Sequence, residues 1–145
     1  MLQKDQQSQL EIAYQKTNYV FSAPNVIRLN IGKPNPLIDK LFNQFNCSTG
    51  GFITACNPQS KKTTPEANRI ANLKLEELLI GKVYFHGVGI DPDTEWKEES
   101  FMVLGIEKMA LVELGRTFEQ NAVVHIEKGH APELVWTDIR EKSNS

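Results

Sequence analysis

Residues 52–81 read FITACNPQSKKTTPEANRIANLKLEELLIG and contain an apolar run, a polar loop and an amphipathic segment. The apolar run, residues 52–56, follows two glycines and has the length of a buried strand. The amphipathic segment is followed by Gly81, a residue type that commonly ends helices. Its apolar side chains recur at helical spacing: Ala67, Ile70, Ala71, Leu75, Leu78 and Leu79. The stretch therefore predicts a buried strand, a loop and a helix.

The start of this helix carries two alternative signals. Thr64 suits the N-cap with Pro65 in the first turn, whereas Thr63 with Glu66 suits a capping box. Either start offers unpaired backbone N–H groups and a partial positive charge, which favour an anion. The loop before it lacks the pattern GxxxxGK[ST], so a nucleotide phosphate loop of the usual kind is excluded.

The rest of the chain alternates between short apolar runs and turn residues. We expect strands near residues 18–21, 26–31, 82–86, 100–104, 122–126 and 134–136, and helices near 36–45 and 106–115. The last two strands suit a hairpin across Gly129 and His130. This order predicts an α+β fold in a single domain, residues 1–139, with two to three helices packed on a mostly antiparallel sheet. The polar residues 140–145 predict a frayed tail.

The composition is that of an ordinary globular domain. A length of 145 residues suits one domain, and 40% hydrophobic with 23% charged residues is a usual balance. The formal net charge of −2 argues against nucleic-acid binding, which requires clustered Lys and Arg. Two cysteines without a CxxC pair favour a reducing compartment. A polar N-terminus and no long apolar run predict a cytoplasmic protein without a membrane segment.

Polar side chains in and after the loop are candidate ligand-binding residues. Asn68 and Asn72 lie one helical turn apart and share a face at the edge of the apolar stripe. With Asn57, Ser60 and Thr64 they could hydrogen-bond a small polar or anionic ligand. The alternative is structural, because buried amides need partners and a loop has carbonyl groups to offer.

An acidic segment, residues 95–100, precedes an apolar strand. Alternation puts Glu99 on the side of Phe101, while Glu98 falls with Ser100. A carboxylate that faces the core side of a sheet has a raised pKa unless it is paired, which suits a general base. Glu99 is therefore the candidate catalytic residue. The alternative is a solvated acidic loop.

Gln120 stands at the entrance of a predicted strand, where an amide can contact a ligand or satisfy a turn. The three histidines form no HxH, HxxxH or HExxH pattern, so we expect neither a metal site nor a cofactor. The pattern GxSxG is also missing, and no catalytic triad is recognisable from the sequence.

Several short blocks resemble a known bacterial family, the domain of unknown function 3293. They are Tyr14 with Thr17 and Tyr19; residues 53–58; Asn68, Asn72 and Leu73; residues 98–101; residues 104–106; and Leu114, Gly115, Phe118 and residues 120–122. The chain has Cys56 where the family commonly has Trp, and Glu119 where it has Gly. The resemblance implies a bacterial cytoplasmic protein of one domain and supplies no activity. It also implies that its polar residues form one group, which is either a site or a buried hydrogen-bond network: Asn57, Asn68, Asn72, Glu99 and Gln120.

Three functions remain open. The first is a small-ligand-binding or regulatory domain, which the many amides favour. The second is a small hydrolase or transferase with Glu99 as general base and the helix start near Thr64 as an anion hole. The third is a protein-interaction module or homodimer that uses Trp136 of the C-terminal hairpin.

Overall fold

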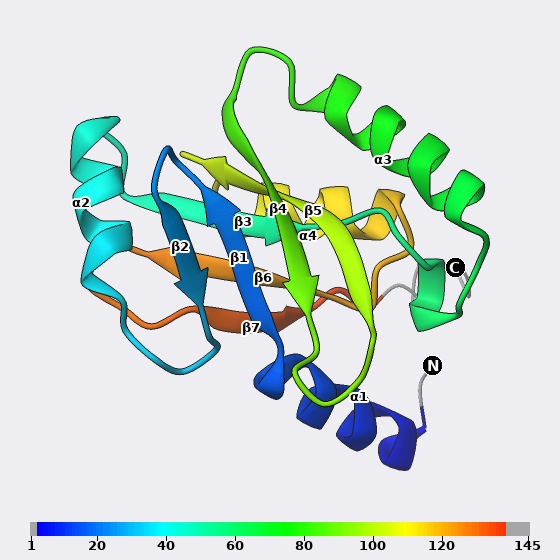
Figure 1. The fold of residues 1–145 in the computed structure, drawn as a ribbon. Helices are drawn as coiled ribbons and strands as arrows, with labels where there is room; N and C mark the ends of the chain where they lie inside the picture. Colours follow the sequence, from blue (N-terminus) through cyan, green and yellow to red (C-terminus); the bar gives the residue numbers. More distant parts are fainter. Residues whose placement is uncertain (1–2, 139–145) are drawn as a thin grey trace.

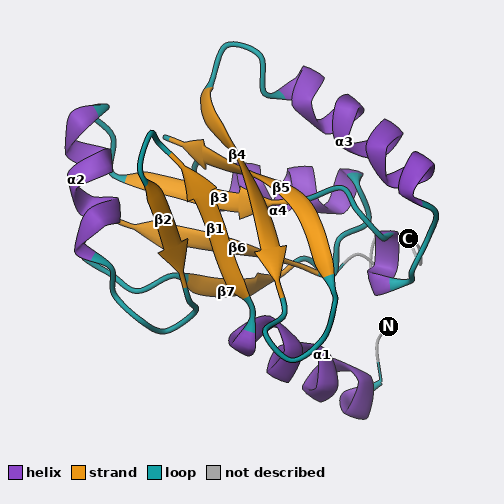
Figure 2. Ribbon diagram, in the orientation of Figure 1, coloured by secondary structure: helices purple, strands orange, loops and turns teal. Residues whose placement is uncertain are grey.

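The computed structural model describes residues 3–138, which form one seven-stranded antiparallel sheet with helices on both faces (Figures 1 and 2). The sheet curls, and its strand order is β2-β1-β4-β5-β3-β6-β7. The strands are β1 (Asn18–Ser22), β2 (Val26–Leu29), β3 (Thr49–Ile53), β4 (Val83–Ile90), β5 (Lys97–Leu104), β6 (Ala122–Glu127) and β7 (Glu133–Trp136). The helices are α1 (Lys4–Lys16), α2 (Pro36–Gln44), α3 (Pro65–Leu78), α4 (Lys108–Thr117) and the short 3₁₀ helix η1 (Pro58–Ser60).

The predicted α+β class and antiparallel sheet are confirmed, but the predicted number of helices is wrong. The described residues contain four α-helices rather than two or three. The additional helix is α1, which the sequence showed only as a short amphipathic stretch. It is mostly polar and none of its residues is buried, so its apolar pattern is weaker than that of the other helices. The tail predicted at residues 140–145 lies outside the described part of the chain.

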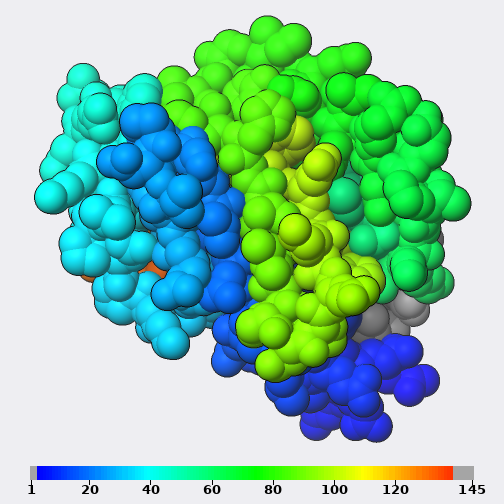
Figure 3. Space-filling view, in the orientation of Figure 1, coloured from blue at the N-terminus to red at the C-terminus, as the bar shows by residue number. Residues whose placement is uncertain are grey.

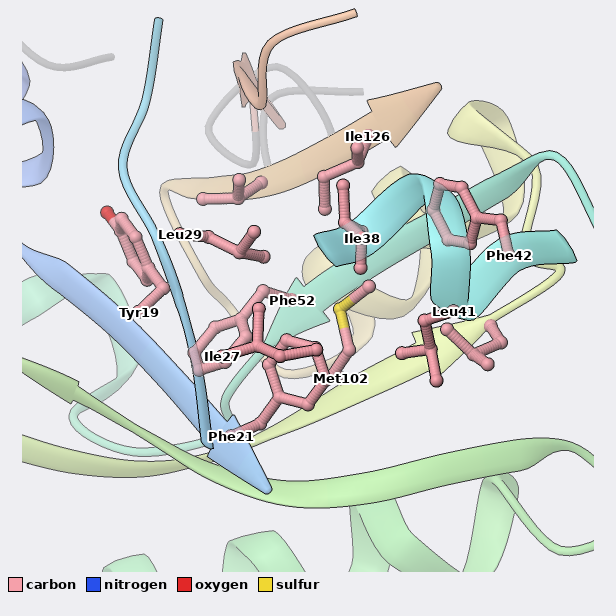
Figure 4. Packing of buried hydrophobic residues seen from close by; sticks show 12 residues of the cluster. Tyr19, Phe21, Ile27, Leu29, Ile38, Leu41, Phe42, Phe52, Met102 and Ile126 are labelled. Atoms are coloured by element: carbon pink, nitrogen blue, oxygen red, sulfur yellow. The ribbon is translucent and has the colours of Figure 1, made fainter. Parts of the chain in front are cut away.

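Strand β5 separates two hydrophobic cores, because its successive side chains point to opposite faces of the sheet. Met102 and Leu104 join a cluster on the face that α2 covers, around Phe42 (Figure 4). Phe101 and Val103 join a second cluster with α3 and α4. Both faces of the sheet are therefore buried over its centre.

The central strand β3 carries two consecutive glycines because both neighbouring layers come very close to it. A Cβ atom on Gly51 would lie 2.4 Å from Cδ2 of Leu111 in α4. A Cβ atom on Gly50 would lie 2.8 Å from Cε of Met102 and 2.9 Å from Cε1 of Phe42 in α2. A larger residue at either position would therefore have to displace Leu111 on one face or Met102 and Phe42 on the other.

Helix α3 starts as the first of the two sequence alternatives predicts. The Thr64 side chain accepts a hydrogen bond from the backbone N–H of Ala67 at 3.1 Å, and Pro65 is the first helical residue. This cap fixes where the loop after β3 ends and the helix begins.

Helix α1 lies at one end of the sheet, next to the turn between β4 and β5, and stands out from the body of the molecule (Figures 1 and 3). Lys16 joins it to this turn through ion pairs with Asp91 at 3.5 Å and Asp93 at 3.4 Å. Tyr14 packs edge-on against Trp136 of β7, with ring centroids 5.9 Å apart. No helix within residues 3–138 is long and apolar enough to span a bilayer.

Candidate functional site

A pocket of about 330 Å³ opens where α1 meets the end of the sheet. Its apolar wall includes Tyr19, Phe52, Val124 and Leu134, which come from four different strands. Its polar groups include Asp91 of the turn between β4 and β5, and four side chains from the segments after β3, before β6 and at the start of β5: Asn57, Ser60, Glu98 and Gln120. The pocket therefore combines an apolar interior with a small set of polar side chains, as ligand pockets do.

Asn57 and Glu98 form the main polar pair of the pocket. Nδ2 of Asn57 donates to Oε2 of Glu98 at 2.8 Å, and Oδ1 of Asn57 accepts from the backbone N–H of Thr63 at 3.0 Å. Because a backbone N–H can only donate, the Thr63 contact fixes the orientation of the amide. Asn68 Nδ2 also donates to Oδ1 of Asn57, at 3.1 Å. The amide is thus held in one orientation before any ligand arrives.

The loop that carries Asn57 has an unusual backbone. Asn57, Gln59 and Ser60 all have left-handed conformations, with φ of 49°, 59° and 60°. Such conformations cost of order 1–3 kcal/mol each for residues other than glycine, and they persist where the surroundings enforce them. Here Gln59 N–H donates to the carbonyl of Glu119 at 2.7 Å, and Asn121 Nδ2 donates to Oγ of Ser60 at 2.9 Å. The segment before β6 therefore holds this loop in place.

Burial sets the electrostatic character of the pocket. It raises the pKa of Glu98, and hydrogen bonds from the side chains of Asn57 and Trp96 only partly oppose this. Burial also raises the pKa of the two tyrosines that line the pocket, Tyr14 and Tyr19. Both phenols therefore stay neutral near neutral pH, and Tyr14 Oη lies 3.4 Å from Oγ of Ser60.

The family model described as "Protein of unknown function (DUF3293)" matches residues 53–123. Over these residues the chain is similar to the DUF3293 family. The resemblance expected from the sequence is confirmed. Searches of the curated proteins and of the solved structures found no match to this chain.

The DUF3293 segment supplies most of the polar groups of the pocket and part of its apolar wall. Asn57, Ser60, Glu98 and Gln120 all lie within residues 53–123. Of the apolar wall, Tyr19, Phe52, Val124 and Leu134 lie outside it, whereas the segment contains Ile53, Trp96, Ala122 and Val123. The segment also starts at the last residue of β3 and ends at the second residue of β6, so it cuts through the sheet.

Three of the predicted ligand-binding residues line the pocket and three do not. Asn57, Ser60 and Gln120 line it, and Gln120 Nε2 also donates to the carbonyl of Cys56 at 3.0 Å. Thr64 caps α3 instead. Asn68 and Asn72 bind the chain itself: Oδ1 of Asn68 accepts from Asn57 N–H at 2.8 Å, and Oδ1 of Asn72 accepts from Ala55 N–H at 2.9 Å. In the DUF3293 segment these two amides hold the loop backbone, as the structural alternative describes.

Glu99, the predicted general base, lies on the other side of β5 from the pocket. Its side chain is exposed and lines a separate groove beside α3, with Arg69, His86 and Lys97. Its backbone carbonyl, rather than its carboxylate, accepts hydrogen bonds from Thr54 and Asn72. A catalytic role of Glu99 therefore stays a prediction without a supporting contact, and the acidic side chain at the Asn57 loop is Glu98.

None of the four aromatic residues that line the pocket, Tyr14, Tyr19, Phe52 and Trp96, was among the predicted site residues. Trp96 has the same alternation as Glu98 and Ser100, so the strand period was a signal that could have found it. Tyr14 comes from α1 and appeared only among the blocks of the DUF3293 resemblance. Among residues 3–138, no three His, Cys, Asp or Glu side chains cluster as metal ligands would.

Proposed function

We propose that this protein binds a small organic molecule in the pocket between α1 and the end of the sheet. The observation that carries the proposal is the pocket of about 330 Å³, whose apolar wall surrounds the hydrogen-bonded pair Asn57 and Glu98. Ligand pockets typically measure about 300–1,000 Å³ and place few polar groups within apolar walls. The volume suits a molecule at the small end of that range.

The fixed orientation of the Asn57 amide supports recognition. Asn68 and the backbone of Thr63 hold this side chain, and the left-handed loop around it is kept in place by the segment before β6. Polar groups that are held in place before binding lose less entropy when the ligand arrives. Backbone strain of this kind is frequent at ligand sites.

A bacterial cytoplasm is the compartment that we propose together with this function. Both cysteines, Cys47 and Cys56, are free thiols, which suits a reducing environment.

Binding can be tested with a panel of small cationic, neutral and anionic molecules, screened by thermal shift and measured by calorimetry. We expect hits that bind the unmodified protein and lose affinity at least tenfold in Ala13→Phe, because Ala13 lines the pocket and a phenyl ring would fill it. Ile12→Phe is the matched control, since Ile12 is the neighbouring residue of α1 and is 66% exposed. A panel without hits, or hits that Ala13→Phe leaves unchanged, would overturn the proposal.

A further inference from the structure

We infer that the ligand of this pocket is a small organic cation whose ammonium or guanidinium group is bound by Glu98, an inference that rests on the proposed function. Two carboxylates line the pocket, Glu98 and Asp91. Within the described residues, no Lys, Arg or His lines it. A ligand in the pocket therefore meets negative charge.

The two carboxylates differ in how their charge is compensated. Asp91 accepts from the backbone N–H of Asp93 at 2.9 Å and lies 3.5 Å from Nζ of Lys16. Glu98 accepts from the neutral amide of Asn57 and forms no ion pair within residues 3–138. The hydrogen bonds from Asn57 and Trp96 use two of the roughly four lone-pair sites of a carboxylate. Glu98 is therefore the group that a ligand cation would bind.

The partial burial of Glu98 favours the binding of a cation. Burial disfavours its ionised form, which is why its pKa is raised. A cationic ligand would offset that penalty by a charge-assisted hydrogen bond. An anionic ligand would add a second negative charge in the same partly dry space, which is unfavourable.

Aromatic rings around the pocket favour the same kind of ligand. Tyr14, Tyr19, Phe52 and Trp96 all line it. The face of an aromatic ring attracts a cation, and aromatic rings beside a carboxylate are a recurrent way to bind organic ammonium groups. The apolar wall would receive the hydrocarbon part of such a molecule.

The sequence left open a small polar or an anionic ligand, and the expectation of an anion concerns another place in the structure. That expectation rested on the start of α3, where Thr64 now caps the backbone N–H of Ala67. Neither residue lines the pocket. The negative charge of the pocket itself favours a positively charged ligand.

Three matched probes separate the charge preference from binding itself: benzylamine, benzyl alcohol and benzoate, titrated at pH 7 by calorimetry. We expect benzylamine to bind at least tenfold more tightly than benzyl alcohol, and benzoate to bind weakest. In Glu98→Gln the preference for benzylamine over benzyl alcohol should fall at least tenfold. Glu99→Gln is the matched control, because Glu99 is the adjacent carboxylate and does not line the pocket.

The outcomes distinguish the two proposals. If none of the three probes binds and the wider panel is also silent, the proposed function fails and this inference fails with it. If benzyl alcohol or benzoate binds as tightly as benzylamine, the pocket binds ligands without preferring cations, and only this inference fails. The comparison of probes on the unmodified protein decides the matter even if Glu98→Gln does not fold. A folded Glu98→Gln protein that keeps the full preference would also overturn the role of Glu98.

Discussion

The side chain of Asn72 in α3 donates a hydrogen bond to the backbone carbonyl of Glu99 in β5 at 2.9 Å. The same amide accepts from the backbone N–H of Ala55 at 2.9 Å, so one side chain joins the segment after β3 to β5. In Asn72→Ala the buried N–H of Ala55 would lose this partner, which costs about 1–3 kcal/mol. Denaturant unfolding should show that loss, whereas Lys74→Ala, an exposed change in the same helix, should stay within about 0.5 kcal/mol. Equal stabilities of the two variants would contradict this role of Asn72.

Two glycines of β4 should respond differently to the same substitution. A Cβ atom on Gly87 would lie 2.6 Å from the backbone oxygen of Val20 in β1, so Gly87→Ala has to push two paired strands apart. We expect a loss of about 1–3 kcal/mol. In Gly89→Ala the nearest atom, Cγ2 of Thr17, would lie 3.7 Å away, an ordinary contact. Thermal unfolding should leave Gly89→Ala close to the unmodified protein, and a comparable loss in both variants would argue against this packing.

The cap of α3 can be measured with two adjacent threonines. Thr64→Ala removes the hydrogen bond to Ala67 N–H and should destabilise the protein by about 1 kcal/mol. Thr63→Ala is the control, because Thr63 donates to Asn57 through its backbone N–H, which the substitution keeps. Chemical denaturation with an unchanged m-value is the measurement. A larger loss in Thr63→Ala than in Thr64→Ala would show that the other capping alternative operates in solution.

Glu98 should make the stability of the protein fall as the pH rises. Burial raises its pKa in the folded state, so the unfolded chain ionises first and draws the equilibrium toward unfolding. The stability contribution of Glu98 is complete below the unfolded pKa of about 4.3 and is lost as the pH rises through the higher folded pKa. Glu98→Gln cannot ionise, so its Tm relative to the unmodified protein should increase from about pH 4 to about pH 8.

Thermal scans across that pH range test the prediction. Tyr14 and Tyr19 line the same pocket and stay neutral throughout the range, so they do not add to the change. Asp91 also lines the pocket, but it is unchanged in both proteins and its contribution cancels in the comparison. If the Tm of Glu98→Gln relative to the unmodified protein decreases as the pH rises, the expected direction is wrong.

Local pattern was enough to predict much of the fold. The apolar stripe and cap of α3, the apolar run of β6 and the turn before β7 all depend on residues near each other in the chain, and each was found close to its predicted position. Helix α1 was missed because it is mostly polar and none of its residues is buried, so its apolar pattern is weak. The strand order was not predictable, since β3 lies between β5 and β6, two strands that follow it much later in the sequence.

The candidate site was predictable only in part for a related reason. Asn57 and Ser60 follow a buried strand, and this position led to the pocket. The choice between Glu98 and Glu99 depended on which face of β5 carries the pocket. Both faces of that strand are apolar, with Phe101 on one side and Met102 on the other, so alternation alone could not decide. The aromatic side chain of Tyr14 reaches the pocket through the placement of α1, which no local pattern indicated.

The position of β3 between β5 and β6 also bears on how the protein is made. Strands β1 and β2 are synthesised one after the other, so they can pair as a hairpin as soon as both have left the ribosome. Strand β3 emerges soon afterwards, but both strands that flank it are synthesised later. Until residue 127 has been added, this glycine-rich strand has at least one unpaired edge, which is the kind of surface that other chains can join. Pairing of both edges of the central strand is therefore complete only when the C-terminal third of the chain has been added.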